Sequence, residues 1–261
     1  MPKCSRQCAI LVLGGTSETA PAVAALLAVG YRVLVSTATG IALSLPDDPR
    51  VERRSGPLDA RGMIDLIRER RLAAVVDVTH PYAVEVKKAA RRAADECGVP
   101  YLRLERATAV RAGESVPLVS DHEGAARLAA SLGRPILLTT GSRNLTPYVR
   151  EAAERGIAIF ARVLPESRQV CVDAGIPPEN IIAGRGPFSV EENRDQIRRY
   201  GIGVLVTKDG GEAGGVPAKL EAARQESCRV VVVKRPASDE NAYGSIRALV
   251  AALRALVKGD G

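Results

Sequence analysis

Apolar runs rich in β-branched residues alternate along the chain with Ala-rich segments whose apolar positions recur at helical spacing. This alternation is typical of βαβ units, which build a parallel sheet covered by helices. The pattern predicts strands at 9–13, 31–36, 73–78, 100–104, 135–139, 157–161, 180–183, 203–207 and 229–234. It predicts helices at 17–29, 60–70, 82–97, 145–155, 189–199, 217–227 and 241–257. The chain is therefore expected to have an α/β fold.

The regular pattern weakens at "RAGESVPLV", residues 111–119, where Gly113 and Pro117 interrupt it. Each side of this stretch has short connections and its own candidates for buried strands. We therefore expect two Rossmann-like parallel-sheet domains, residues 1–113 and 114–261. The cleft between two such domains is the default position for a binding site.

Length and composition exclude several classes of protein. The 261 residues suit one large or two small domains. No apolar stretch approaches the roughly 18 residues of a membrane span, and the N-terminus lacks the apolar core of a signal peptide. With five cysteines and two histidines, neither a disulfide framework nor a metal site is expected. A soluble cytoplasmic protein follows, with its oligomeric state left open, a monomer included.

The formal net charge of +7 favours anionic partners. Nucleic acid is not expected, because the basic residues are dispersed, Trp is absent, and aromatic residues make up only 3% of the chain. A small molecule with several negative charges fits better.

The stretch "LVLGGTSETA" places Gly14, Gly15, Thr16 and Glu18 between a predicted strand and a predicted helix. Backbone N–H groups and the helix dipole bind phosphate in this context. The turn lacks the third glycine of the G-x-G-x-x-G fingerprint. The alternative interpretation is a tight bend with a capped helix.

The second predicted strand ends in "VLVSTATG", which carries the hydroxyls of Ser36, Thr37 and Thr39. Proteins that bind NAD usually place Asp or Glu at this strand end, to hold the ribose. Hydroxyls donate to a 2′-phosphate without repelling it, so NADPH is favoured over NADH. An ordinary polar strand end is the alternative.

A third strand is followed by "THPYA", with Thr79, His80, Pro81 and Tyr82. His80 can titrate near neutral pH, and Tyr82 can donate a proton or a hydrogen bond. The alternative is that His80 only caps the next helix.

The second half contains further strand-end loops. "LLTTGSRNL" carries Gly141 and Arg143, a second candidate anion site or simply a capped helix start. "AGRGPFSVEEN" carries Arg185, whose planar guanidinium suits carboxylate or phosphate, followed by Ser189 as an expected N-cap. A solvated surface arginine is the alternative for Arg185.

"VLVTKDGGEAGGVPAKL" places Lys208 and Asp209 directly after a strand and Lys219 in the first turn of a helix. Lysine is unfavourable beside the positive end of a helix, which suggests that Lys219 meets an anion. Glycines such as Gly210 and Gly215 allow a close approach of the backbone to a ligand. A flexible surface loop is the alternative.

The motifs GGTSE, DVTHPYA, GRGPFS, VTKDGGEAGG and VVVVKRP, in this order, resemble the precorrin-6A reductase family of vitamin B12 biosynthesis, from about residue 9 to 236. The resemblance implies two Rossmann-like domains and an enzyme that reduces one double bond of a tetrapyrrole, precorrin-6A, to give precorrin-6B with NADPH. The substrate carries many carboxylates, in agreement with the positive net charge.

The resemblance also implies roles for individual residues. Those expected to bind the cofactor are Gly14, Gly15, Thr16, Glu18, Ser36, Thr37, Thr79, Gly141 and Arg185. Those expected to bind the substrate are Arg143, Lys208, Gly210, Gly215 and Lys219, with the division of second-domain contacts between cofactor and substrate left open. The candidate proton donors are Lys208, Tyr82 and His80, with a bound water as the alternative.

Two other functions stay open at this point. One is an NADP-dependent reductase or epimerase of another anionic molecule, although the Tyr-x-x-x-Lys pair of short-chain enzymes is missing, because Lys87 comes one residue too late after Tyr82. The other is a non-catalytic module that senses a dinucleotide.

Overall fold

The computed structural model describes residues 8–40, 43–105, 108, 116–211, 214–236 and 242–257. The chain forms two compact units. Unit 1 is Met1–Ala107 together with Ala237–Gly261, and unit 2 is Thr108–Pro236. Each unit contains one parallel sheet with helices on both faces, so the expected pair of α/β domains is confirmed. The expected interdomain cleft stays a prediction.

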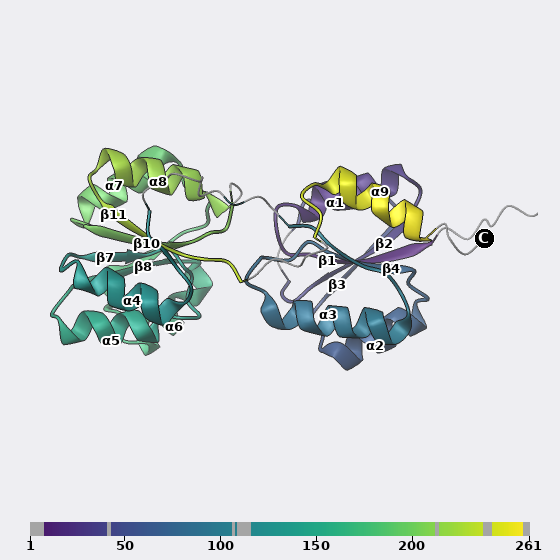
Figure 1. The fold of residues 1–261 in the computed structure, drawn as a ribbon, viewed down its shortest axis with the longest axis horizontal. Coiled ribbons are helices and arrows are strands. Elements are labelled where there is room, and N and C mark those ends of the chain that lie inside the picture. Colours follow the sequence, from purple (N-terminus) through teal and green to yellow (C-terminus); the bar gives the residue numbers. More distant parts are fainter. Residues whose placement is uncertain are drawn as a thin grey trace, which may run out of the picture. The chain divides into compact units, whose positions relative to one another are not determined.

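Unit 1 contains a five-stranded sheet in the order β3-β2-β1-β4-β5 (Figure 1). Its strands are β1 (Ala9–Leu13), β2 (Arg32–Thr37), β3 (Val51–Ser55), β4 (Ala74–Asp77) and β5 (Tyr101–Arg103). Helices α1 (Thr19–Ala28) and α9 (Ile246–Val257) cover one face, and α2 (Ala60–Glu69) and α3 (Val84–Cys97) cover the other. This is the doubly wound arrangement of dinucleotide-binding folds.

The central strand β1 shows why this sequence forms a buried parallel strand. Successive side chains of a strand point to opposite faces, and both faces of this sheet are covered. Ile10 and Val12 pack into the core beneath α1 and α9, whereas Leu11 and Leu13 pack beneath α2 and α3. A continuous apolar run is therefore what this position requires.

The C-terminal helix α9 differs from the sequence prediction, which assigned residues 114–261 to the second domain. Leu249 and Leu253 are buried in the unit 1 core, together with Leu26 of α1. Just before the helix, Tyr243 pairs with Leu104 beyond the end of β5, and its N–H donates to the carbonyl of Arg103. An amphipathic helix can cover any sheet, so its sequence did not reveal which one it joins.

Unit 2 contains a six-stranded parallel sheet in the order β6-β11-β10-β7-β8-β9. Its strands are β6 (Leu118–Val119), β7 (Ile136–Leu138), β8 (Ile159–Val163), β9 (Ile181–Ala183), β10 (Val204–Lys208) and β11 (Arg229–Val233). Figure 1 shows α7 (Val190–Arg199) and α8 (Val216–Gln225) on one face, and α4 (His122–Ser131), α5 (Thr146–Glu154) and α6 (Arg168–Asp173) on the other. Two 3₁₀ turns, Pro165–Ser167 and Pro178–Asn180, flank α6.

The sequence pattern missed several short elements. Strand β3 reads VERRS and lies at the sheet edge, where few apolar residues are needed. Helix α4 buries only alanines, which give a weak apolar signal. Strand β6 has two residues and follows the expected hinge, whose residues 111–115 lie outside the described part of the chain. Helix α6 was not expected either.

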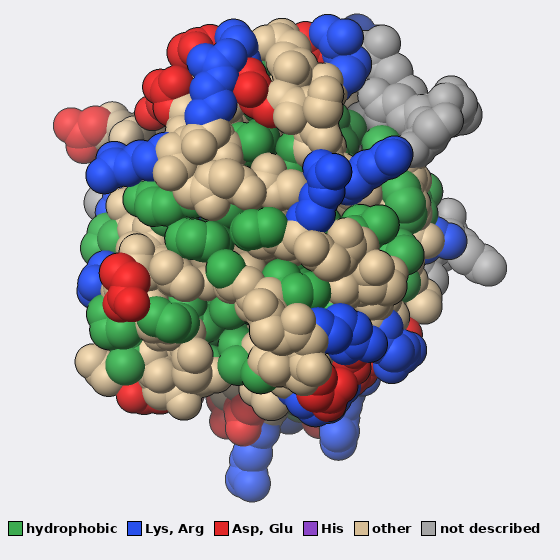
Figure 2. All heavy atoms as spheres, turned by 90° about the vertical axis from the view of Figure 1, so that its left-hand side faces the viewer, with side chains coloured by type: hydrophobic (Ala, Val, Ile, Leu, Met, Phe, Trp, Pro, Cys, Tyr) green, Lys and Arg blue, Asp and Glu red, His purple; other side chains and the backbone are tan. Residues whose placement is uncertain are grey.

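The described residues show no feature typical of a membrane span or a metal site. Among the described residues, no helix is both long and apolar enough to cross a bilayer, and no three His, Cys, Asp or Glu side chains come together as metal ligands. On the face drawn in Figure 2, Lys and Arg occur in separate groups, several of them beside Asp or Glu. That face therefore lacks the continuous basic stripe typical of nucleic-acid binding.

Candidate active site

The chain order in the unit 1 sheet reverses between β1 and β4, so the carboxyl ends of these strands form the topological switch point, where ligands bind in open α/β sheets. A hydrogen bond links the loop after β1 to the loop after β4. Thr16 Oγ1 donates to the carbonyl oxygen of Val78 at 2.7 Å. On the other side, the Gly14 N–H donates to the Ser36 carbonyl at the end of β2. Three of the predicted strand-end loops thus lie at one edge of the sheet.

The turn after β1 is organised by a buried residue that the sequence analysis did not single out. Thr19 is fully buried, and its Oγ1 accepts hydrogen bonds from the N–H groups of Gly15 and Thr16, both at 3.1 Å. A Cβ on Gly14 would lie 2.6 Å from Thr19 Cγ2, and Gly15 has φ +106°. Both glycines are therefore required, and the Thr19 hydroxyl holds the turn in one shape.

Glu18 occupies the N-cap position of α1, and its carboxylate accepts a hydrogen bond from Ser17 Oγ at 3.1 Å. Helix α1 begins only at Thr19, two residues later than predicted. A carboxylate at this point repels phosphate and accepts from hydroxyl groups. The start of α1 consequently suits the sugar hydroxyls of a dinucleotide better than a phosphate placed directly against Glu18.

The end of β2 carries a cation that sequence reasoning missed. Arg54 on the neighbouring strand β3 pairs with Ser36 in the sheet register, and Arg54 Nη1 donates to Ser36 Oγ at 3.0 Å. Thr37, next along β2, donates from Oγ1 to the carbonyl of Thr39. The sequence "VERRS" contains Arg54, but only the pairing of β2 with β3 places this arginine beside Ser36.

A buried ion pair supports the loop after β4. Asp77 and Arg103 are almost completely buried and meet at 2.6 Å. The same carboxylate accepts from the Tyr101 hydroxyl and from the Thr79 N–H. Burial, and then the charge of Asp77, raise the pKa of Tyr101, which stays neutral. Asp77 therefore holds the start of the Thr79–Tyr82 loop in place through its hydrogen bond with the Thr79 N–H.

His80 and Tyr82 lie in that loop, before α3 begins at Val84. His80 is exposed, and its Nδ1 accepts a hydrogen bond from the Tyr82 N–H at 3.3 Å. The two ring centroids are 5.5 Å apart. The predicted helix start at 82 was early, because Pro81 and Tyr82 form a turn.

The corresponding switch point in unit 2 lies between β7 and β10. Gly141, with φ +82°, and Arg143 follow β7, while Lys208 is the last residue of β10. Burial, and then the neighbouring charge of Arg143, lower the pKa of Lys208. Thr140 is buried, and its hydroxyl has no hydrogen-bond partner among the described residues. Predicted substrate and cofactor residues therefore meet at this edge.

His122, which sequence reasoning did not connect to the site, lies near Lys208 at the start of α4. Burial, and then the charge of Lys208, lower the pKa of His122 to about 4, so the ring is neutral at neutral pH. Its Nδ1 is 2.8 Å from the hydroxyl of Tyr148, which is fully buried. No sequence signal marks His122, because its neighbours come from β10 and α5.

A second cationic group in unit 2 is built around Arg162 of β8, which is 6% exposed. Its Nη1 donates to Asn193 and Gln196 of α7 at 2.8 Å each, and its guanidinium lies 4.1 Å from the centre of the Phe188 ring. Its Nη2 and Nε make no hydrogen bond with the described residues. These donors remain available to a ligand.

Lys219 lies beside Arg162 in the first turn of α8. Burial, and then the charge of Arg162, lower the pKa of Lys219 to about 8. Its ammonium donates to the carbonyl of Gly214 at 2.8 Å, and the N-cap Gly215 has φ +65°. Two cations are thus held together at a helix N-terminus, where each disfavours the charge of the other and an anion would relieve both.

Comparison with known proteins identifies the family of this chain. The family model described as precorrin-6x reductase CbiJ/CobK matches residues 9–254. The chain belongs to this family. It is 35% identical over 240 residues to the cobalt-precorrin-6A reductase of Priestia megaterium, covering 91% of this chain and 93% of that protein. It is 33% identical over 233 residues to the precorrin-6A reductase of Rhodococcus erythropolis, covering 87% and 89%.

A solved structure described as CobK precorrin-6A reductase has the same fold, with a TM-score of 0.75 and 24% identity over 95% of this chain and 96% of that one. The family resemblance inferred from the motifs is therefore confirmed, and the chain is a member of a family of reductases.

In this member of the precorrin-6x reductase family, some predicted site residues lie outside the strand-end loops and cationic groups described above. Arg185 is exposed and forms an ion pair with Glu166 at 3.0 Å. Gly210 lies two residues after Lys208, and its N–H donates to the Lys208 carbonyl. Asp209 is buried against Arg235 and Thr108. Arg185 is thus exposed, and its predicted contact with the cofactor stays a prediction.

Proposed function

We propose that this chain catalyses the NADPH-dependent reduction of one double bond of precorrin-6A to give precorrin-6B. Membership of the precorrin-6x reductase family supports the reaction and implies a nicotinamide dinucleotide reductant. The observation that carries the choice of NADPH is the Arg54–Ser36 pair at the end of β2. Unit 1 is proposed to bind the cofactor along the switch point of its sheet.

In dinucleotide-binding folds, residues at the end of β2 contact the 2′ position of the adenosine ribose and so distinguish NADPH from NADH. An arginine and a hydroxyl bind a 2′-phosphate, whereas an acidic residue would bind the 2′-hydroxyl and repel the phosphate. Ser36 and Thr37 provide hydroxyls there, and Arg54 provides the charge. The hydroxyl pattern alone predicted NADPH, and Arg54 adds the cation that this prediction lacked.

Replacement of Arg54 tests the cofactor proposal. We expect Arg54→Ala to lower kcat/KM for NADPH about 10- to 100-fold, because hydrogen bonds to a charged group contribute about 1.5–3 kcal/mol. Steady-state kinetics with NADH should be nearly unchanged. Arg53→Ala is the matched control, since Arg53 is the adjacent residue on β3 and is exposed. An equal loss with both cofactors would contradict the 2′-phosphate assignment.

Substrate binding is assigned to unit 2. Precorrin-6A carries many carboxylates, and unit 2 presents Arg143 with Lys208 at one loop group and Arg162 with Lys219 at another. The unbonded donors of Arg162 match a carboxylate.

The charge state of Lys219 gives a test with a defined sign. With its pKa lowered to about 8, Lys219 is mostly cationic below that pH and mostly neutral above it. We expect the dissociation constant of precorrin-6A, measured without NADPH, to rise about tenfold as the pH passes 8, because a charge-assisted hydrogen bond is lost. Lys219→Arg should remove this rise, since arginine stays protonated. An unchanged pH dependence in that variant would assign the effect elsewhere.

The reaction needs a hydride, which NADPH supplies when bound, and a proton for the adjacent atom. Among Lys208, Tyr82 and His80, we assign the proton to Lys208. A buried lysine with a lowered pKa is a stronger acid than an exposed one and donates more readily near neutral pH. Arg143 lowers the pKa further, and the neutral ring of His122 adds no charge beside it.

The proposed reaction is tested with purified protein, NADPH and precorrin-6A, prepared with and without cobalt, since the relatives include reductases of both kinds. Loss of reduced-nicotinamide absorbance together with formation of a product containing two more hydrogen atoms is expected. Oxidation of NADPH without a corrinoid product would contradict the proposal.

A further inference from the structure

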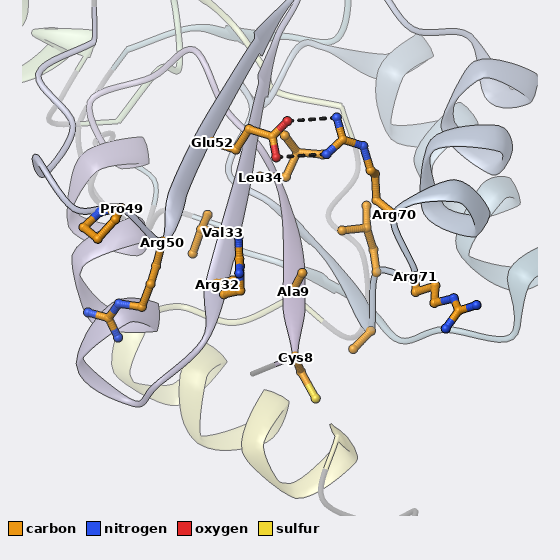
Figure 3. A pocket seen from close by; sticks show the side chains of 12 residues that line it. Cys8, Ala9, Arg32, Val33, Leu34, Pro49, Arg50, Glu52, Arg70 and Arg71 are labelled. Carbon is orange, nitrogen blue, oxygen red and sulfur yellow. Dashed lines mark hydrogen bonds and ion pairs between the residues drawn. The ribbon is translucent and has the colours of Figure 1, made fainter. Parts of the chain in front are cut away.

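A cavity of about 610 Å³ lies at the amino ends of β1, β2 and β3 in unit 1 (Figure 3). We call it the amino-edge cavity. It is at the opposite edge of the sheet from the Gly14–Glu18 turn, which follows the carboxyl end of β1. Its lining comes from the first residues of these strands and from the segment after α2, and includes Arg32, Arg50, Glu52, Arg70 and Arg71. The volume is in the range of small-molecule sites.

The lining has an excess of positive charge. The lining includes four arginines and one carboxylate, that of Glu52, which Arg70 holds in a two-bond ion pair of 2.9 and 3.0 Å. Arg50 pairs with Asp48 at 2.7 Å. The guanidinium groups of Arg32 and Arg71 make no hydrogen bond or ion pair with the described residues. Within the described part of the chain, the guanidinium groups of Arg32 and Arg71 therefore have no acidic partner.

Arg71 also has an unfavourable backbone conformation. Most helices in the described chain are followed by a glycine in the left-handed region. These glycines are Gly30, Gly98, Gly133, Gly156, Gly175 and Gly201. After α2 the position is held by Arg71, with φ +48°, and after α8 by Ser227, with φ +52°. A residue with a Cβ is strained there, and strained residues concentrate at functional sites.

We propose that the amino-edge cavity binds the polyphosphate group of a phosphorylated metabolite, with Arg32 and Arg71 as its main ligands. Guanidinium groups bind phosphate oxygens through paired hydrogen bonds. In Figure 3, Arg32 lies between Arg50 and Arg71, whose guanidinium groups point to opposite sides of the view. Pro49 and Leu72 add apolar wall to the cavity for the rest of such a molecule. The proposal does not depend on the proposed reductase activity.

The probe is inorganic pyrophosphate, titrated calorimetrically into the whole protein without NADPH, whose own diphosphate group would compete for the same cations. We expect binding that weakens at least about tenfold in Arg32→Ala and in Arg71→Gly. Arg53→Ala is the charge control, because Arg53 lies on β3 outside the cavity lining. It should bind pyrophosphate as the unmodified protein does.

Arg71→Gly has a second readout, because it removes both the charge and the backbone strain. It is expected to raise Tm while weakening pyrophosphate binding, whereas Ser227→Gly should raise Tm and leave binding unchanged. ATP is expected to bind at least as tightly as pyrophosphate, and citrate more weakly. The proposal is overturned if pyrophosphate fails to bind, if Arg53→Ala weakens binding as much as Arg71→Gly does, or if citrate binds more tightly.

Discussion

Asp77→Ala is expected to lower the free energy of unfolding of unit 1 by about 3–5 kcal/mol, the cost of removing one partner from a buried ion pair. The change leaves the Arg103 guanidinium buried at 2% exposure without its carboxylate. It also removes the acceptor of the Tyr101 hydroxyl and the Thr79 N–H. Native-state hydrogen exchange of the Val75 and Val76 amides in β4 reports this stability for unit 1 by itself.

The matched control is Glu52→Ala, which breaks the ion pair with Arg70. Both side chains of that pair are about half exposed, so the expected loss is below about 1 kcal/mol. If Asp77→Ala costs no more than Glu52→Ala, the Asp77–Arg103 pair is not what supports the loop after β4. Weaker cofactor binding should accompany the loss of stability, because Thr79 begins that loop.

Lys208→Met is expected to slow single-turnover reduction of precorrin-6A about 10²- to 10⁴-fold, the usual contribution of a general acid. The reason is the position of Lys208 at the end of β10, where burial and Arg143 lower its pKa. In the unmodified enzyme the rate should fall as the pH rises through that lowered pKa, because the acid form is lost. Stopped-flow measurement across pH checks both the size and the sign.

Lys234→Met is the control for charge and position, since Lys234 follows β11 as Lys208 ends β10 but is exposed. It should react at the rate of the unmodified enzyme. His80→Ala and Tyr82→Phe are expected to stay within about threefold, equivalent to roughly 0.7 kcal/mol. If Lys208→Met also stays within that limit, a bound water is the better proton donor.

The fold was largely predictable, because strand periodicity and the two-sided burial of parallel sheets leave few alternatives for runs such as AILVL. The missed elements have physical reasons. Edge strand β3 needs little apolar surface, and α4 packs through alanine. The assignment of α9 to unit 1 depends on contacts between Leu26 and Leu253, more than two hundred positions apart in sequence.

The candidate site was predictable where glycines and hydroxyls follow strands, as at Gly14 and Gly141, because backbone conformation marks these positions locally. The cations Arg54 and Arg162 could not be predicted as site residues, because each is placed there by a hydrogen-bond partner on another element. Arg185 shows the reverse case. A glycine-rich loop suggested a ligand contact; the exposed side chain pairs with Glu166 in the structure, and the contact with the cofactor stays a prediction.

The central claim is that residues of this chain bring the reduced nicotinamide to the macrocycle for direct hydride transfer. The most direct measurement is a single turnover with precorrin-6A and NADPH carrying deuterium at nicotinamide C4, using each stereoisomer in turn, followed by mass spectrometry of the product. One stereoisomer is expected to place one deuterium on a carbon of the product. A reduced product without deuterium from either stereoisomer would contradict the account.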